Sequence, residues 1–207
     1  MHMKVLTFLG DDFERLCRNL ADKVLEKNFD PDLVVGILTG GGVIGRISCD
    51  EFKKRIKNHQ VYYTEVKLQR PSTVVKAKRN STHKLAKLPT WLLDILRIAE
   101  VYYYEFKVRF VNPRREGVLS LDDGIVRLLK MGGKKILIID DCIDTGYTVK
   151  IIKDYFMYHF PGNDFRVAVA TVSHRHPVVL PEYQLYNRVL LRFPWANDVK
   201  NEKSSNC

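Results

Sequence analysis

The chain has 207 residues, of which 45% are hydrophobic and 28% are charged, as expected for a soluble globular protein with a sizeable core. No apolar run reaches the roughly 18 residues that a membrane-spanning helix requires, and acidic residues come too early for a secretory signal. The formal net charge of +10 favours anionic partners, either phosphorylated metabolites or nucleic acid.

The cysteine pattern indicates a reducing compartment. Cys17, Cys49, Cys142 and Cys207 show no C-x-x-C spacing and no paired histidines nearby, which argues against a zinc site. A disulfide framework does not suit a chain of this length and composition. We therefore expect a cytoplasmic protein.

The first third of the chain alternates between helices and short strands. Apolar spacing predicts an amphipathic helix over residues 12–27. Residues 33–38 form a continuous apolar run, typical of a strand buried on both faces of a parallel sheet. A glycine cluster follows, then a predicted helix over about 43–57 and a strand over 61–66 that is rich in β-branched and aromatic residues.

A basic insertion comes next. The stretch 67–87 contains basic residues and no acidic residue. This pattern fits a solvated loop and a loop that faces phosphate equally well. Beyond it, the spacing predicts a helix whose aromatic-rich face, Trp91 to Phe106, is either core or a contact in a homodimer or higher homo-oligomer. We treat 67–110 as a basic loop with a helical insertion inside a single domain of residues 1–197.

The second half repeats the alternation. The pattern predicts a helix over 121–131, a strand over 136–139, a helix over about 148–160, and strands over 167–172 and 189–191. Alternating strands and helices predict an α/β fold with a central parallel sheet flanked by helices. Residues 198–207 are polar and predict a flexible tail.

The end of the 136–139 strand carries the most informative residues. The run ILIIDDCIDTGYT places Asp140 and Asp141 where ligands bind in open α/β sheets, and two adjacent carboxylates need a cation or ligand hydroxyls to compensate them. The loop that leads into the next helix exposes main-chain amides and predicts a cradle for a phosphate monoester. Its residues are Asp144, Thr145, Gly146, Tyr147 and Thr148. Helix capping by Asp144 or Thr145 is the alternative, but it leaves the acidic pair unexplained.

This run resembles the binding motif for 5-phosphoribosyl-1-pyrophosphate (PRPP) of type I phosphoribosyltransferases. That motif has four apolar residues, two acids, two mostly apolar residues and Asp-Thr-Gly-x-Thr; here Cys142 replaces a residue that is usually β-branched. Residues 34–42 resemble the family's pyrophosphate loop, with Thr39 in place of the usual Arg or Lys. The non-proline cis peptide that this loop often carries would fall at Leu38–Thr39.

A third resemblance concerns the C-terminal segment. Pro181-Glu182-Tyr183, followed by Phe193-Pro194-Trp195, is similar to the hood of 6-oxopurine phosphoribosyltransferases of the xanthine–guanine and hypoxanthine kind. The resemblance implies a small hood, formed by the N-terminus and residues 173–197. It also implies an enzyme of purine salvage and nucleotide metabolism, which transfers ribose 5-phosphate from PRPP to a nitrogenous base, a purine, and releases pyrophosphate.

The resemblance also implies a role for each site residue. Asp140, Asp141 and Asp144 would be catalytic: the first two would position ribose hydroxyls or the water shell of Mg²⁺, and Asp144 would be the general base. The 5′-phosphate would bind Asp144, Thr145, Gly146, Tyr147 and Thr148, and the pyrophosphate would bind Thr39, Gly40, Gly41 and Gly42. Lys67 and Arg70 would belong to the flexible loop, and Arg175, Leu190 and Leu191 would contact the base.

Two alternatives compete with this interpretation. Gly40-x-Gly42-x-x-Gly45, with Glu65 at a suitable distance, also fits a Rossmann dinucleotide site, but that hypothesis leaves residues 140–148 unexplained. A PRPP-sensing regulator that binds nucleic acid would suit the charge of +10, although no recognition helix is visible in the sequence.

Overall fold

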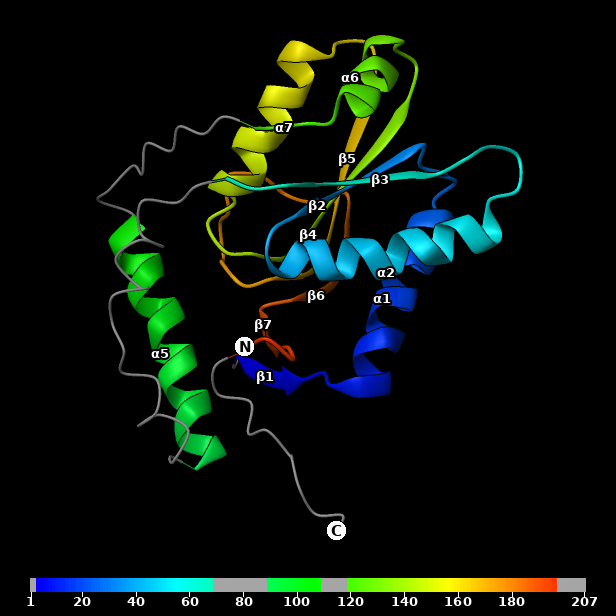
Figure 1. Cartoon of the computed structure of the whole chain (residues 1–207). Coiled ribbons are helices and arrows are strands. Elements are labelled where there is room, and N and C mark those ends of the chain that lie inside the picture. Colours follow the sequence, from blue (N-terminus) through cyan, green and yellow to red (C-terminus); the bar gives the residue numbers. More distant parts are fainter. Residues whose placement is uncertain (1–2, 69–88, 109–118, 197–207) are drawn as a thin grey trace.

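A central parallel sheet organises the molecule (Figure 1). The computed structural model describes residues 3–68, 89–108 and 119–196. Five strands lie in the order β3-β2-β4-β5-β6, and every neighbouring pair is parallel. They are β2 (Leu33–Ile37), β3 (Tyr62–Val66), β4 (Lys135–Ile143), β5 (Asp164–Val172) and β6 (Tyr183–Asn187). The predicted α/β fold is confirmed.

Helices cover both faces of this sheet. One face is covered by α1 (Gly10–Leu25) and α2 (Gly40–Arg55), and the other by α6 (Asp123–Lys130) and α7 (Tyr147–His159). The helix of the insertion, α5 (Thr90–Val108), stands outside these layers in Figure 1. In the described ranges, none of the helices has the length and apolar character needed to cross a membrane.

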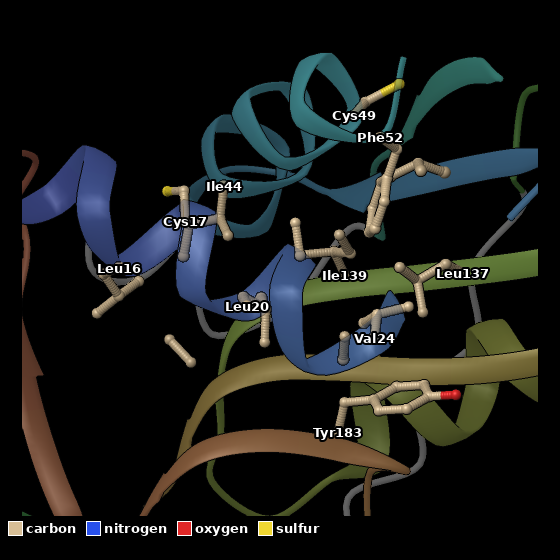
Figure 2. Packing of buried hydrophobic residues seen from close by; sticks show 14 of the residues in the cluster. Leu16, Cys17, Leu20, Val24, Ile44, Cys49, Phe52, Leu137, Ile139 and Tyr183 are labelled. Atoms are coloured by element: carbon tan, nitrogen blue, oxygen red, sulfur yellow. The ribbon is translucent and has the colours of Figure 1, made fainter. Parts of the chain in front are cut away.

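Strand β4 shows why its apolar run is continuous. Side chains alternate between the two faces of a strand, so Leu137 and Ile139 join the core under α1 and α2, whereas Ile136 and Ile138 join the core under α6 and α7. Figure 2 shows Leu20 and Val24 of α1 lying beside Leu137 and Ile139. A central strand that is covered by helices on both sides needs apolar residues at its odd and its even positions.

The hood is a separate two-stranded parallel sheet. Strand β1 (Lys4–Thr7) pairs with β7 (Val189–Arg192), so that Val5 faces Leu190 and Thr7 faces Arg192. The segment after β7 packs on α1, where the Phe13 ring lies 5.4 Å from the Trp195 ring. The predicted hood from both ends of the chain is thus confirmed. Strands β1 and β6 were not predicted, because short strands with mixed burial have little periodicity.

Two element boundaries differ from prediction near the carboxyl ends of the strands. Helix α2 starts at Gly40, three residues before the predicted start at Val43, so the glycine cluster forms its first turn. Strand β4 continues past the acidic pair to Ile143, because the ladder to β5 continues through Cys142 and Ile143. Backbone pairing depends on main-chain groups, so polar side chains do not end it.

The predicted apolar face of α5 is not core. Trp91 is 63% exposed, Ile95 53% and Tyr102 48%, whereas Leu93 is buried. The side chain of Phe106 lies outside the described part of the structure. Burial on α5 therefore falls on Leu93, outside the predicted face, whereas Trp91 and Ile95 of that face stay exposed.

The first prediction concerns the α1 core. Replacing the fully buried Leu20 with alanine should lower the free energy of unfolding by about 2–5 kcal/mol, because it leaves a cavity between α1 and the sheet. Urea denaturation measures the change. Leu180→Ala is the control, since Leu180 is 70% exposed and its truncation should cost less than about 0.5 kcal/mol. Equal losses in both variants would contradict the assigned core.

Candidate functional site

The residues predicted to bind the 5′-phosphate, the ribose and the pyrophosphate meet at one edge of the sheet. Because all five strands are parallel, their carboxyl ends lie on the same side. Strand β2 leads there into Leu38–Thr39 and the first turn of α2, β4 into the 144–148 loop, and β5 into Ser173. The Leu38–Thr39 peptide bond is cis, as predicted.

The glycines of α2 lie directly against the acidic pair. A β-carbon added at Gly40 would overlap the Asp141 carboxylate. One added at Gly41 would lie 2.5 Å from the Ile139 carbonyl oxygen and 2.9 Å from Asp140 Oδ1. Real side-chain atoms do not approach so closely, so only glycine lets the start of α2 reach the end of β4. The structure therefore brings the predicted pyrophosphate loop and the two aspartates together.

Asp140 and Asp141 lie where burial makes the charged form of a carboxylate unfavourable. Asp140 is buried, Asp141 is half-buried, and the Asp141 amide donates to Asp140 Oδ1 at 2.9 Å. Burial raises the pKa of Asp141, and the charge of Asp144 raises it further, although a hydrogen bond with Asp140 opposes the shift. Positive charge or hydroxyl donors from a ligand would stabilise the ionised pair.

The acidic pair alone does not form a metal site. Within the ranges that the structure describes, no group of three or more His, Cys, Asp or Glu side chains could hold a metal ion. Two carboxylates fit the way Mg²⁺ is often bound in phosphate sites, where substrate oxygens and water supply the remaining ligands. The residues thus fit a Mg²⁺ ion that arrives with a phosphorylated substrate.

The 144–148 loop has the backbone shape of an anion cradle. Gly146 has φ of 82°, a left-handed conformation, and a β-carbon there would lie 3.1 Å from the Val179 amide nitrogen. Helix α7 follows, and its first bond runs from the Lys150 amide to the Gly146 carbonyl at 2.9 Å. The first amides of a helix have no acceptor within it and favour anions.

The capping alternative does not hold for α7. Its N-cap is Gly146, and no side chain makes a capping hydrogen bond there. Asp144 instead accepts hydrogen bonds at Oδ1 from Ser173 Oγ and from Cys142 Sγ, the latter at 3.2 Å. Burial, and then the charge of Asp144, raises the pKa of Cys142, so the thiol remains protonated and can donate. The hydrogen bonds from Ser173 and Cys142 to Oδ1 thus orient the Asp144 carboxylate.

Ser173 is a site residue that was not predicted from the sequence. Its amide donates to the Ile143 carbonyl at 3.0 Å, which continues the pairing of β4 and β5 to the point where Ser173 reaches Asp144. The available signal was its place directly after a buried parallel strand. Cys142 was noted only as a departure from the motif, and its contact with Asp144 depends on tertiary structure.

A second missed group supports the glycine turn. The Tyr63 hydroxyl on β3 lies 2.6 Å from the Gly42 carbonyl and 2.9 Å from Glu65 Oε1. Burial raises the pKa of Tyr63 and keeps its hydroxyl protonated. Glu65 pairs with Arg46 at 2.6 Å, and the Arg46 hydrogen bond lowers the pKa of Glu65. The carboxylate that a dinucleotide site would direct to a ribose is therefore engaged within the protein.

The base-contact candidates divide between two segments. Arg175 is exposed in the turn after β5. Leu191 belongs to the core under α1, so Leu190, which alternates with it on β7, is the leucine that faces away from that core. His174 Nδ1 accepts from the His176 amide at 3.0 Å, and among the described residues its buried Nε2 has no hydrogen-bond partner.

The predicted flexible loop is only partly described. Lys67 is exposed directly after β3, on the edge of the sheet where the other candidates lie. Arg70 and the rest of the basic stretch up to residue 88 lie outside the described residues, as does the predicted tail.

Sequence and structure comparisons identify the family. The model of the phosphoribosyl transferase domain matches residues 9–198. A purine phosphoribosyltransferase from Pyrococcus horikoshii has a similar structure at 14% identity and a TM-score of 0.56, over 93% of this chain and 95% of that one. The Helicobacter pylori xanthine-guanine-hypoxanthine phosphoribosyltransferase is similar at 12% identity and a TM-score of 0.55, over 92% of both chains.

A third structure is a hypothetical protein from Neisseria gonorrhoeae with bound ppGpp, similar at 15% identity and a TM-score of 0.56 over 94% of this chain and 90% of that one. No curated protein matches the sequence. Because the domain model spans nearly the whole chain, the protein belongs to the phosphoribosyltransferase family. It is an enzyme of that class with the type I fold, and its glycine pattern is not a Rossmann site.

The second prediction tests the contact between glycine and acid. Gly41→Ala should destabilise the fold by about 1–3 kcal/mol, because its new methyl group meets main-chain atoms of β4 that cannot rotate away. Thermal unfolding measures this. Val43→Ala is the control, since Val43 is 40% exposed in the same helical turn and should change little. If Gly41→Ala unfolded at the same temperature as the wild type, α2 would not be in close contact with β4.

Proposed function

We propose that this protein transfers ribose 5-phosphate from PRPP to a nitrogenous base, a purine, and releases pyrophosphate. The observation that carries the proposal is the direct contact between the glycine turn of α2 and the acidic end of β4, beside the 144–148 loop. PRPP has a pyrophosphate, ribose hydroxyls and a 5′-phosphate in that spatial order. Three matching elements at one sheet edge suit such a ligand better than a simple phosphate.

Each element has a proposed role. The loop residues Asp144 to Thr148 hold the 5′-phosphate through main-chain amides and hydroxyls. Thr39 and the glycines Gly40 to Gly42 hold the pyrophosphate, while Asp140 and Asp141 orient ribose hydroxyls or water around Mg²⁺. When bound, Mg²⁺ neutralises charge on the leaving pyrophosphate.

Asp144 acts as the general base in this proposal. The bond from the ribose anomeric carbon to pyrophosphate breaks, its electron pair leaves with pyrophosphate, and a nitrogen of the base bonds to that carbon and loses its proton to Asp144. Oδ1 accepts from Ser173 and Cys142, which leaves Oδ2 to face the base. The negative carboxylates stabilise the positive charge that develops on the ribose.

The proposed acceptor base follows from the structural relatives and from the hood residues. Similarity to purine phosphoribosyltransferases supports a purine as the acceptor, and a role in cytoplasmic purine salvage is part of this proposal. Leu190 is the candidate for packing on the ring, with Arg175 and His174 as candidate donors to its polar edge. Without a cation at Thr39, the loop that begins at Lys67 and includes Arg70 is the proposed source of positive charge for pyrophosphate. A homo-oligomer stays a prediction.

The third prediction tests the reaction. Purified protein with PRPP and Mg²⁺ should yield a nucleotide from at least one of hypoxanthine, guanine, xanthine and adenine, detected by product mass. Asp144→Asn should lower kcat by about 10²–10⁴-fold, because it removes the proton acceptor. Asp154→Asn, at an exposed ion pair with Lys150, is the matched control. No nucleotide from any base would refute the proposed activity.

The fourth prediction concerns the orientation of Asp144. Ser173→Ala should lower kcat about fivefold with little change in the KM for PRPP, because it removes one hydrogen bond to a charged carboxylate. Ser173→Thr retains the hydroxyl and should restore most of the rate. If alanine and threonine variants were equally slow, a packing defect and not the hydrogen bond would be responsible.

A further inference from the structure

Helix α5 is tied to the hood by a buried charge. Arg192 on β7 is only 5% exposed, and its Nη2 lies 2.6 Å from Asp94 Oδ1 on α5. Its Nη1 donates to Thr7 Oγ1 of β1 at 3.0 Å. A buried guanidinium needs a charged partner, because desolvation is costly unless a counter-ion compensates it. Asp94, whose side chain is 33% exposed, forms an ion pair with Arg192.

Two further contacts join the same elements. Arg97, one helical turn after Asp94, donates to the Leu191 carbonyl at 3.5 Å. The Arg188 guanidinium lies 5.7 Å from the ring centre of Tyr102, while its Nη1 donates to the Ser173 carbonyl at 2.7 Å. Helix α5 thus contacts β7 near its end and, through Arg188, the segment that orients Asp144.

The tether lies on a particular face of β7. Side chains alternate along a strand, so Leu190 and Arg192 share one face, and Leu191 lies on the other face in the core under α1. Asp94 therefore approaches the face that carries Leu190, the candidate for packing on the base. Leu190 is itself only 8% exposed, so this face of β7 is largely covered.

We propose that α5 forms the outer wall of the acceptor-base subsite and that the Asp94–Arg192 ion pair holds this wall in place. Asp94 is then a positioning residue for base binding, although it touches neither PRPP nor the reacting atoms. This inference rests on the proposed function, because its ligand is the nucleobase. It gives the helical insertion a part in selecting the acceptor.

The test compares Asp94→Asn with the wild type. Asparagine keeps the shape of the side chain and removes the charge, so KM for the base should rise about five- to tenfold. KM for PRPP and kcat at saturating base should stay within about twofold, because the 144–148 loop and the acidic pair are not altered. Asp94→Glu should restore much of the affinity, and Asp154→Asn should leave all constants unchanged.

Hydrogen exchange supplies a readout that does not need activity. Loss of the ion pair should speed exchange of the β7 amides, residues 189–192, without affecting β2 or β4. Unchanged β7 exchange in Asp94→Asn overturns the tether, and faster exchange with an unchanged KM for the base overturns the subsite role. An inactive wild type would refute the proposed function instead. Base binding measured by calorimetry would then decide the inference: an unchanged affinity in Asp94→Asn, or no binding by the wild type, overturns it.

Discussion

The close approach of α2 to the end of β4 is the constraint on which the site depends. A helix can start directly against an acidic strand end only if its first residues have no side chains, and Gly40 and Gly41 meet that condition. The same contact aims the amino end of the helix at Asp140 and Asp141. A positive helix end beside two carboxylates suits a ligand that carries both phosphate and hydroxyl groups.

Support for this arrangement comes from behind the site. The Tyr63 hydroxyl holds the Gly42 carbonyl on one side, and Ser173 and Cys142 hold Asp144 on the other. Tyr63 lies on β3, Cys142 lies on β4 and Ser173 directly follows β5. Strands β3 and β5 are the outer neighbours of β2 and β4, which lead into the site. Binding sites of high precision need such fixed side chains around the groups that touch the ligand.

The hood and the insertion form a second region with different physics. The sheet core is held by apolar packing, whereas α5 meets β7 through ionic and polar contacts centred on Arg192. Such contacts are directional, so they can place a helix accurately without a large apolar interface. Trp91 takes no part in these contacts and is left 63% exposed in the described structure.

The sequence alone determined the α/β class, the order of the main elements and the cluster formed by residues 140–148, because buried parallel strands and glycine-rich loops have strong local patterns. It also located the cis peptide at Leu38–Thr39 by resemblance. Only the tertiary structure revealed the contacts of Ser173 with Asp144 and of Asp94 with Arg192. The residues of these pairs are 29 and 98 positions apart in the sequence. They meet only when the chain folds, so no local sequence pattern predicts their contact.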